Sequence, residues 1–286
     1  MRAIALLATY NEERFIRSCL DHLIANGLDV YLIDNDSTDR TVELARPYLG
    51  RGLLDIETIP RDGVYRWRAI LERKEALANQ LDADWFMHTD PDEVRLPPSP
   101  GSTLADAFCD AGERGFNAVN FCEFTFLPTR EAPDHDHASF QETMRWYYPY
   151  KSNGLHGLKA WKRPVGRSRS PFGRQRRPAE FAWSGGHRVR FRGLRVYPHS
   201  FPMRHYLFLS VPHAIEKYVE RRYDADEIRS GWHQWRAQIT ADALRLPSTS
   251  ELRVYESDSK LDPSEPRSTH YVAQWLEEAR RAAVTA

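Results

Sequence analysis

The stretch that decides the fold is Trp85-Phe86-Met87-His88-Thr89-Asp90-Pro91-Asp92-Glu93, an apolar run that ends in acidic residues. Its apolar beginning predicts a short strand buried on both faces, as in a parallel sheet. Ligands of open α/β sheets bind beyond the carboxyl ends of the strands. Two acids separated by one residue on a turn can face one divalent cation together, and their oxygens suit magnesium or manganese better than zinc. The stretch therefore predicts an α/β sheet with Asp90 and Asp92 at a ligand-binding edge.

The residues before this stretch alternate apolar runs with helical periodicity, which is typical of successive βαβ units. Strands are expected over residues 3–7, 30–33, 54–59 and 85–87, and helices over 16–24, 41–49 and 66–81. Further on, a helix is expected over 103–113, a strand over 118–126, and helices over 214–222, 230–244 and 270–283. The pattern predicts an α/β half over 1–127, a loop-rich half of the same domain over 128–209, and a helical C-terminal region over 210–286.

The composition is that of a folded chain with no excess of either charge. Its 286 residues include 40 Lys and Arg against 40 Asp and Glu, and 41% are hydrophobic. This hydrophobic content excludes wholesale disorder, and zero net charge argues against a nucleic-acid partner. No apolar run approaches the roughly 20 residues that a transmembrane helix needs. The three cysteines form no CxxC pair, which favours a cytoplasmic location. Peripheral association with a membrane through the aromatic-rich or basic segments stays open.

Polar clusters follow three of the expected strands, at Thr9–Glu12, Asp34–Ser37 and Asp90–Glu93. If these strands are parallel neighbours, the three clusters meet at one edge of the sheet. Each cluster also has a plain structural interpretation, because Asn, Asp and Glu often cap or open helices and acids are common on solvated turns. Their shared position at strand ends favours the ligand-binding interpretation.

Several well-known nucleotide, metal and nucleophile motifs are missing from the sequence. It contains neither a G-x-G-x-x-G segment nor a P-loop, which argues against the usual dinucleotide and P-loop nucleotide sites. It also lacks an H-E-x-x-H zinc motif and a G-x-S-x-G nucleophile elbow. Zinc proteases and serine hydrolases of the usual kinds are therefore excluded.

The second half offers weaker candidates. Gly185-Gly186-His187 joins a flexible glycine pair to an imidazole that could bind a metal, although a single loop histidine is more often structural. Asp134-His135-Asp136-His137 resembles a metal cluster, but alternating loop residues are usually solvated. The basic residues that could meet phosphate or sugar hydroxyls are Lys151, Lys159, Lys162 and Arg204.

Three segments together resemble family 2 glycosyltransferases of the GT-A fold: Leu7–Glu13, Ile33–Thr41 and Trp85–Glu93. They occur in that family's order and spacing and cover about the first hundred residues. Weaker likenesses to an uncharacterised bacterial branch lie in the segments from Gly185 to Pro198, Arg204 to Tyr206 and Gly231 to His233. Two features depart from the family's pattern: Ala8 stands where the family usually has proline, and no ED-type catalytic-base motif is recognisable.

The resemblance implies a site as well as a fold. Asp34 is expected to accept a hydrogen bond from the base, Asp90 to lie nearer the ribose, and Asp92 to touch the metal. His187 would complete the metal shell. The other residues expected at the nucleotide sugar are Thr9, Tyr10, Asn11, Glu12, Asn35, Arg68 and Lys74.

Direct displacement with inversion, which the resemblance implies, needs a carboxylate that takes the acceptor proton. The catalytic residues expected are Asp92, Glu123 and Asp136, and Asp134 and Glu180 are further candidates for the base. The assignment among the possible bases stays open.

The resulting hypothesis is a cytoplasmic, Mn²⁺- or Mg²⁺-dependent glycosyltransferase. It would use a nucleoside diphosphate sugar, a UDP- or GDP-sugar first of all, and an acceptor that is a glycan, a lipid-linked sugar or a small molecule. One alternative is a non-catalytic nucleotide-sugar or glycan-binding protein on the same scaffold. The other is a sugar nucleotidyltransferase, which the acidic rather than basic segment after the first strand disfavours.

Overall fold

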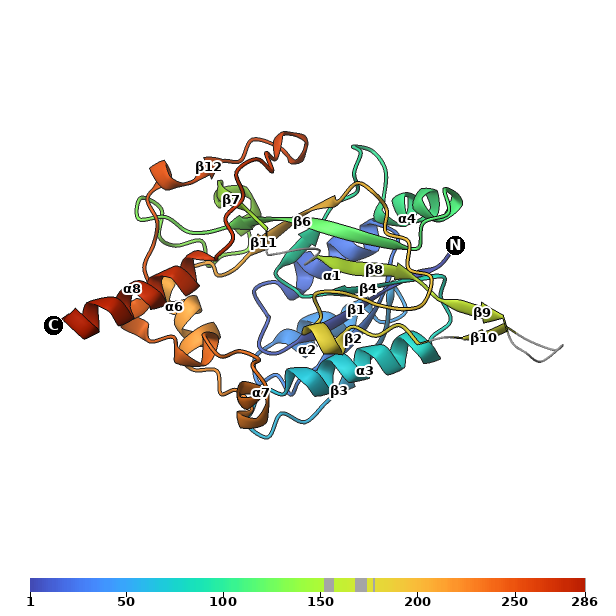
Figure 1. Ribbon diagram of the computed structural model, residues 1–286, viewed down its shortest axis with the longest axis horizontal. Coiled ribbons are helices and arrows are strands. Elements are labelled where there is room, and N and C mark those ends of the chain that lie inside the picture. Colours follow the sequence, from blue (N-terminus) through green and yellow to red (C-terminus); the bar gives the residue numbers. More distant parts are fainter. Residues whose placement is uncertain (152–156, 168–173, 177, 286) are drawn as a thin grey trace. The chain divides into compact units, whose positions relative to one another are not determined.

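A computed structural model describes residues 1–151, 157–167, 174–176 and 178–285 of the chain (Figure 1). The strands are β1 (Ala3–Thr9), β2 (Asp29–Asp34), β3 (Leu53–Thr58), β4 (Trp85–Thr89), β5 (Glu93–Arg95), β6 (Ala118–Phe126), β7 (Trp146–Tyr150), β8 (Leu158–Lys162), β9 (Val165–Arg167), β10 (Arg174–Arg176), β11 (Phe201–Tyr206) and β12 (Arg253–Val254). The α-helices are α1 (Ile16–Ala25), α2 (Thr41–Ala45), α3 (Trp67–Gln80), α4 (Leu104–Glu113), α5 (Phe140–Thr143), α6 (Val211–Ala214), α7 (Ala225–Arg229) and α8 (Tyr271–Thr285). Within these ranges, no helix has both the length and the apolar character needed to cross a bilayer.

The chain divides into two compact units. Unit 1 comprises Met1–Pro60, Trp67–Phe121 and Leu155–Met203, and unit 2 comprises Arg61–Arg66, Cys122–Gly154 and Arg204–Ala286. This division differs from the expected boundaries at residues 127 and 209. The reason is strand pairing, since β8, from the region expected to be rich in loops, pairs antiparallel with β4 and with the first part of β6.

The central part of unit 1 is a parallel sheet in the order β4-β1-β2-β3, with β8 beside β4 (Figure 1). All seven residues of β1 are buried, because this strand has a neighbour on each side and helices on both faces. The continuous apolar runs of the sequence therefore predicted these strands correctly. The mostly parallel α/β architecture that we expected is confirmed.

Helices cover the two faces of this sheet. Buried residues of α1, α2 and α4 join one core cluster with Ala5 and Leu7 of β1 and Met87 of β4. On the other face, Trp67 and Lys74 of α3 contact His88 of β4. Side chains of a strand alternate between the two faces of the sheet. The turn that follows each strand therefore determines which side chains lie at the carboxyl edge of the sheet.

Unit 2 has its own core. The second part of β6 pairs antiparallel with β7, which also pairs with β12. A buried cluster gathers around Tyr148, Phe208 and Trp275, and α8 contributes Val272 and Leu276 to it. The expected C-terminal helix over 270–283 corresponds to α8.

The helix expected over 230–244 is wrong. That segment contains only two short 3-10 turns, Arg236–Gln238 and Ala241–Ala243. Gly231 (φ 93°) and His233 (φ 55°) adopt left-handed conformations, which a right-handed helix cannot contain. The helix expected over 214–222 is shifted by three residues: α6 begins at Val211 and continues into the π-helical turn Ile215–Val219.

Candidate functional site

Three polar clusters meet at the carboxyl edge of the sheet in unit 1. Strands β2 and β4 are the parallel neighbours of β1, and Thr9 at the end of β1 lies in register with Asp34 at the end of β2. On the other side of β1, Leu7 lies in register with Thr89, the last residue of β4 and the residue before Asp90. The edge therefore brings together segments that are about eighty positions apart in the sequence.

Asp34 is held firmly in the first part of this edge. Its side chain is buried and accepts hydrogen bonds from the Thr9 hydroxyl at 3.3 Å and the Ser37 backbone N–H at 2.9 Å. Asn35 is buried beside it and donates from its side-chain amide to the Ile59 carbonyl at 3.1 Å. These contacts close the turn after β2 in the manner of an Asx turn. They also give Asp34 and Asn35 a structural role.

Asn11 and Glu12 join the loop after β1 to the loop after β2. The Asn11 carbonyl side-chain oxygen accepts from the Thr38 N–H at 2.8 Å, and its own N–H donates to the Ser37 hydroxyl at 2.9 Å. Asn11 does this from a left-handed conformation with φ 54°, which asparagine tolerates better than most residues. The Glu12 N–H donates to the Thr41 hydroxyl at 2.7 Å. Tyr10, half-buried, lies between Thr9 and this pair.

The loop after β4 rests on a cluster of buried charges. Glu93 accepts from the Lys159 ammonium at 2.6 Å and from Arg95, and Lys159 also lies 4.0 Å from a carboxylate oxygen of Asp90. Burial and the nearby Glu93 carboxylate raise the pKa of Asp90, while Lys159 opposes that rise. Asp92 is also buried. Lys159 and Arg95 thus offset the charge of Glu93, and Lys159 also lies near the charge of Asp90.

Lys74 lies beneath the edge. Its side chain is fully buried, and its ammonium donates to Nδ1 of His88 at 2.9 Å and to the Thr89 carbonyl at 3.2 Å. Burial lowers the pKa of Lys74 to about 8. Burial and the Lys74 charge also lower the pKa of His88, which leaves its imidazole neutral and able to accept. Lys74 therefore holds the end of β4, whereas Arg68, six residues earlier on α3, is exposed.

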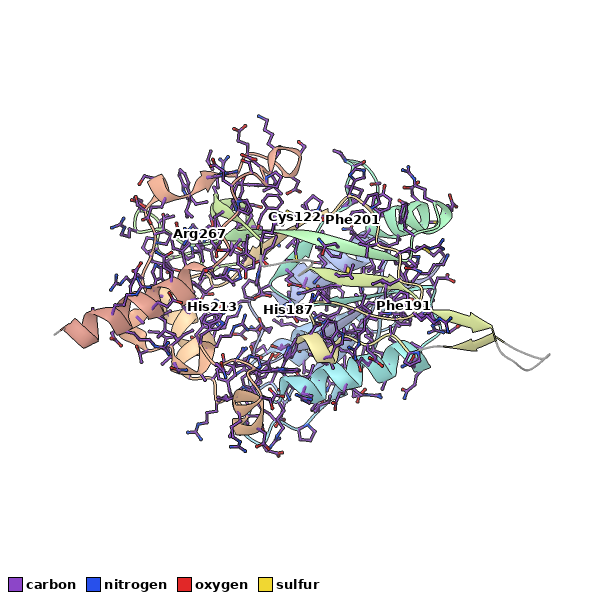
Figure 2. All side chains as sticks on the ribbon, in the orientation of Figure 1. Cys122, His187, Phe191, Phe201, His213 and Arg267 are labelled. Atoms are coloured by element: carbon purple, nitrogen blue, oxygen red, sulfur yellow. The ribbon has the colours of Figure 1, made fainter. Side chains whose placement is uncertain are left out.

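Asp90, Asp92 and His187 do not gather into a metal site of three protein ligands. Among the described residues, no group of three or more His, Cys, Asp and Glu side chains is arranged to hold a metal ion. His187 lies on the turn after the 3-10 segment Ala182–Ser184, and its carbonyl accepts from the Leu158 N–H (Figure 2). Two oxygen ligands on the loop after β4 fit a hard divalent cation, provided that the remaining ligands come from a bound anion.

Unit 2 contains a second cluster of titratable groups, centred on Glu123. Its carboxylate lies 2.7 Å from Nδ1 of His205, accepts from the Thr125 hydroxyl at 2.8 Å, and lies 3.9 Å from Nε2 of His270. Burial acts to raise the pKa of Glu123, but the charges of the two histidines and these hydrogen bonds lower it to about 2. The tyrosine hydroxyl of Tyr148 pairs with Nδ1 of His270 at 2.8 Å.

The other base candidates lie in different surroundings. Asp134 and Asp136 are exposed on one loop, where an Asp134 oxygen accepts from the Asp136 N–H at 2.9 Å. Glu180 is exposed and forms an ion pair with Arg190 at 2.8 Å. Glu123, in contrast, is largely buried and lies beside two imidazoles.

Sequence reasoning missed the partners of the predicted acids. His88 interrupts a buried apolar strand, and a polar group in such a place needs a hydrogen-bond partner, so this signal was available. Glu93 and Arg95 are two residues apart on a strand and share a face, which is a weaker signal. No sequence pattern links Glu123 to His205, because they lie on strands that are far apart in the chain.

Comparison with known proteins agrees with this arrangement. Residues 5–94 match the family model described as glycosyl transferase family 2. No curated protein matches the chain.

Similarities to solved structures are distant. TarS of S. aureus is 13% identical with a TM-score of 0.40, over 72% of this chain and 37% of that one. A shorter TarS chain in complex with UDP is 14% identical with a TM-score of 0.39, over 73% of this chain and 61% of that one. Glucosyl-3-phosphoglycerate synthase of Mycobacterium tuberculosis, in complex with Mn²⁺, UDP and glucosyl-3-phosphoglycerate, is 20% identical with a TM-score of 0.29, over 43% of this chain and 44% of that one. This chain spans less than two thirds of each of them.

The family match runs from β1 to the loop after β4 and includes all three polar clusters of the edge. It also agrees with the parallel α/β arrangement of unit 1. Residues 5–94 of this chain are thus similar to glycosyl transferase family 2.

Proposed function

We propose that this chain is a glycosyltransferase that moves a sugar from a nucleoside diphosphate sugar to an acceptor hydroxyl with inversion. The observation that carries the proposal is the meeting of Thr9–Glu12, Asp34–Asn35 and Asp90–Asp92 at one edge of a parallel sheet, within the segment that matches family 2. A UDP- or GDP-sugar is the proposed donor. The acceptor is a glycan, a lipid-linked sugar or a small molecule.

The proposed reaction is a single displacement at the anomeric carbon. The acceptor oxygen forms a bond to that carbon as the bond to the diphosphate oxygen breaks, and the hydroxyl proton passes to a base. The pair of Glu123 and His205 is our proposed acid–base unit, in which the carboxylate stabilises the positive imidazolium. Asp136 is a second candidate base. A carboxylate with a pKa of about 2 binds protons poorly at neutral pH, so the imidazole would carry the proton.

Asp90 and Asp92 are the residues that we propose for a divalent cation, Mn²⁺ or Mg²⁺, together with diphosphate oxygens. Such a cation, when bound, neutralises the charge that grows on the departing nucleoside diphosphate. Thr9, Tyr10, Asn11, Glu12 and Asp34 would border the nucleotide, with Arg68 near the diphosphate. His187 remains a candidate for the cation shell. Lys74 would act indirectly, by holding the end of β4.

We also propose a cytoplasmic location. Cys19, Cys109 and Cys122 are free thiols, as expected in a reducing compartment.

A thermal-shift panel tests the proposed donor site. UDP, GDP, CDP and dTDP and their common sugar conjugates are added with and without Mn²⁺ or Mg²⁺, because a ligand that binds the folded state raises its melting temperature. We expect one nucleotide to raise Tm only with the cation, and Asp92→Asn to abolish that rise. Asp110→Asn, on α4 and outside the edge, is the matched control and should keep the rise.

The same panel separates the alternatives. Binding of a sugar nucleotide without hydrolysis or transfer to any acceptor would favour a binding protein on this scaffold. Release of pyrophosphate from a nucleoside triphosphate would favour a sugar nucleotidyltransferase. A normal, cation-dependent shift in Asp92→Asn would contradict the role that we propose for that residue.

A further inference from the structure

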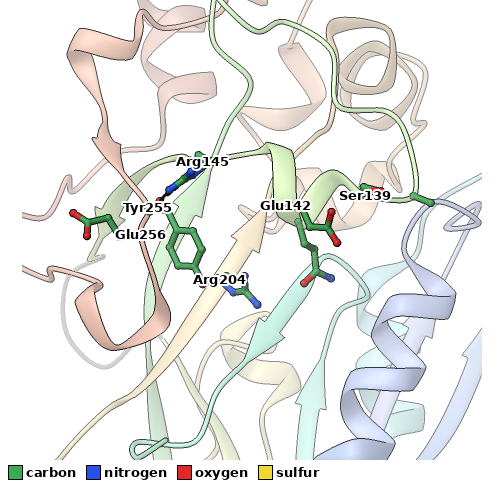
Figure 3. A pocket seen from close by; sticks show the side chains of 8 residues that line it. Ser139, Glu142, Arg145, Arg204, Tyr255 and Glu256 are labelled. Atoms are coloured by element: carbon green, nitrogen blue, oxygen red, sulfur yellow. Dashed lines mark hydrogen bonds between the residues drawn. The ribbon is translucent and has the colours of Figure 1, made fainter.

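Unit 2 contains a pocket that the proposed donor chemistry does not use. Its volume is about 580 Å³, which lies in the range of sites for small ligands. Residues that line it include Ser139, Glu142, Arg145, Arg204, Tyr255 and Glu256 (Figure 3). They come from α5 and its flanks, from β11 and from the segment after β12.

Ring packing and hydrogen bonds hold the residues that line this pocket in place. On one side, the buried ring of Phe140 anchors α5 by packing edge-on against Tyr206, with ring centroids 5.0 Å apart. On the other side, the Tyr255 hydroxyl donates to Asp258 at 2.8 Å, and the Tyr255 carbonyl accepts from Nε and Nη2 of Arg145 at 3.2 and 2.8 Å. A site that is already organised loses less entropy when it binds a ligand.

Arg204 supplies a hydrogen-bond donor that the described protein does not satisfy. Its side chain is only 12% exposed, and Nη1 donates to the Tyr206 hydroxyl at 3.2 Å. Nε lies 3.4 Å from an Asp258 oxygen but forms no hydrogen bond with any described residue. Because Nε is shielded, the part of Arg204 that a ligand in the pocket can meet is the rest of its guanidinium.

Glu142 supplies an exposed acceptor at the same pocket. It lies on α5 across the pocket from Tyr255 and Arg204 (Figure 3). Its carboxylate forms no hydrogen bond or ion pair with the part of the chain that the structure describes. Glu256, in contrast, is paired with Lys260.

The charges that line the pocket select a ligand class. An oxyanion only accepts hydrogen bonds and would be repelled by Glu142 and Glu256, whereas a cation only donates and would be repelled by Arg145 and Arg204. A hydroxyl group both donates and accepts, so neighbouring hydroxyls can satisfy a guanidinium and a carboxylate together. The Tyr255 ring adds an apolar surface for the carbon side of a sugar ring.

We propose that this pocket binds a saccharide, whose hydroxyls accept from Arg204 and donate to Glu142. Saccharide binding to this pocket does not depend on the proposed glycosyl transfer. Its assignment as the place where an acceptor saccharide is held rests on the proposed function.

The test is a titration of the full chain without nucleotide, followed by saturation-transfer NMR. The probes are the methyl glycosides of glucose, galactose and mannose, N-acetylglucosamine and cellobiose, with sodium sulfate and putrescine as anionic and cationic probes. We expect at least one saccharide to bind saturably, and Glu142→Gln and Arg204→Lys each to weaken that binding about tenfold or more, because each loses a hydrogen bond to a charged group. Glu277→Gln and Arg229→Lys, exposed on α8 and α7, are the matched controls and should bind normally.

Three outcomes would overturn the proposal: binding of sulfate or putrescine in place of any saccharide, no saccharide binding at all, or equal saccharide affinity in wild type and Glu142→Gln. Glu142 is exposed, so its substitution should leave folding intact. A parallel thermal shift with UDP and Mn²⁺ separates the two proposals. Nucleotide binding without saccharide binding would refute the pocket alone, and the reverse would refute the donor site alone.

Discussion

The charged side chains of this protein are expensive to bury singly, and the fold buries them in pairs. Glu93 lies between Lys159 and Arg95 in unit 1, and Glu123 lies beside His205 and His270 in unit 2. Removing one member of such a group leaves an uncompensated charge, which costs about 3 to 5 kcal/mol in buried pairs. Single substitutions therefore test how much each of these buried charge pairs contributes to stability.

Glu123→Gln should change how stability depends on pH. The pKa of Glu123 is about 2 in the folded protein and near 4.5 when unfolded, so its contribution is present above about pH 4.5 and is lost as pH falls toward 2. We expect the wild type to lose on the order of 3 kcal/mol relative to the variant across that window. Urea unfolding at a series of pH values measures the difference.

The exposed Glu277→Gln serves as the control and should follow the wild type. In a His205→Asn background, the effect of Glu123→Gln should shrink, since the imidazole charge is a main cause of the low pKa. If the stability of the wild type and of Glu123→Gln depended on pH in the same way, the ion pair between Glu123 and His205 would be refuted.

At the scale of elements, the turn at Gly185-Gly186 is built around a close approach to β4. Gly186 has φ +85°, and a Cβ placed there would lie 2.8 Å from Nε2 of His88 and 3.1 Å from Cδ2 of Leu71. His88 in turn accepts from Lys74, which holds the carbonyl of Thr89. The turn therefore packs against the same histidine that supports the strand end before Asp90.

Gly186→Ala should destabilise the protein more than a positive φ alone explains. Gly193 is the matched control, because it has φ +84° and a Cβ placed on it would meet nothing within 4 Å. We expect Gly193→Ala to cost about 1 kcal/mol and Gly186→Ala about 1 to 3 kcal/mol more. Thermal or urea unfolding of both variants measures this, and equal losses would contradict the close approach.

Some helices and strands follow from the local sequence alone, whereas others depend on contacts with distant residues. β1, β2 and β4 follow from continuous apolar runs, and α1 and α4 from apolar stripes at helical spacing. The helix expected over 230–244 failed because Gly231 and His233 take left-handed conformations. His233 packs there against Tyr65 and Tyr223, contacts with residues that the local pattern does not include.

At the scale of the whole molecule, two separate cores and a balance of charge stand out. The core described for unit 1 lies between the parallel sheet and helices α1, α2 and α4, and that of unit 2 includes Tyr148, Phe208 and Trp275. The chain carries 40 basic and 40 acidic residues, and its isoelectric point is about 7.2. A protein with no net charge lacks the repulsion that keeps molecules apart.

Solubility should therefore pass through a minimum near neutral pH. We expect precipitation by polyethylene glycol to be easiest near pH 7.2 and harder about two pH units to either side. Arg229→Glu, at a side chain that is 72% exposed, should move the minimum to lower pH, whereas Arg229→Lys should leave it in place. Solubility that changes steadily across this range, without a minimum, would contradict the prediction.

The sequence by itself determined the α/β architecture of the first hundred residues, the three polar clusters at strand ends and the similarity of residues 5–94 to glycosyl transferase family 2. These features have local causes, since periodicity, apolar runs and turn residues act over short stretches of chain. Only the tertiary structure decided that β8 joins the sheet beside β4, that Lys74 lies beneath the edge, and that Glu123 pairs with His205. The saccharide pocket belongs to the same class, because strand pairing and side-chain contacts between distant segments leave no periodic trace in the sequence.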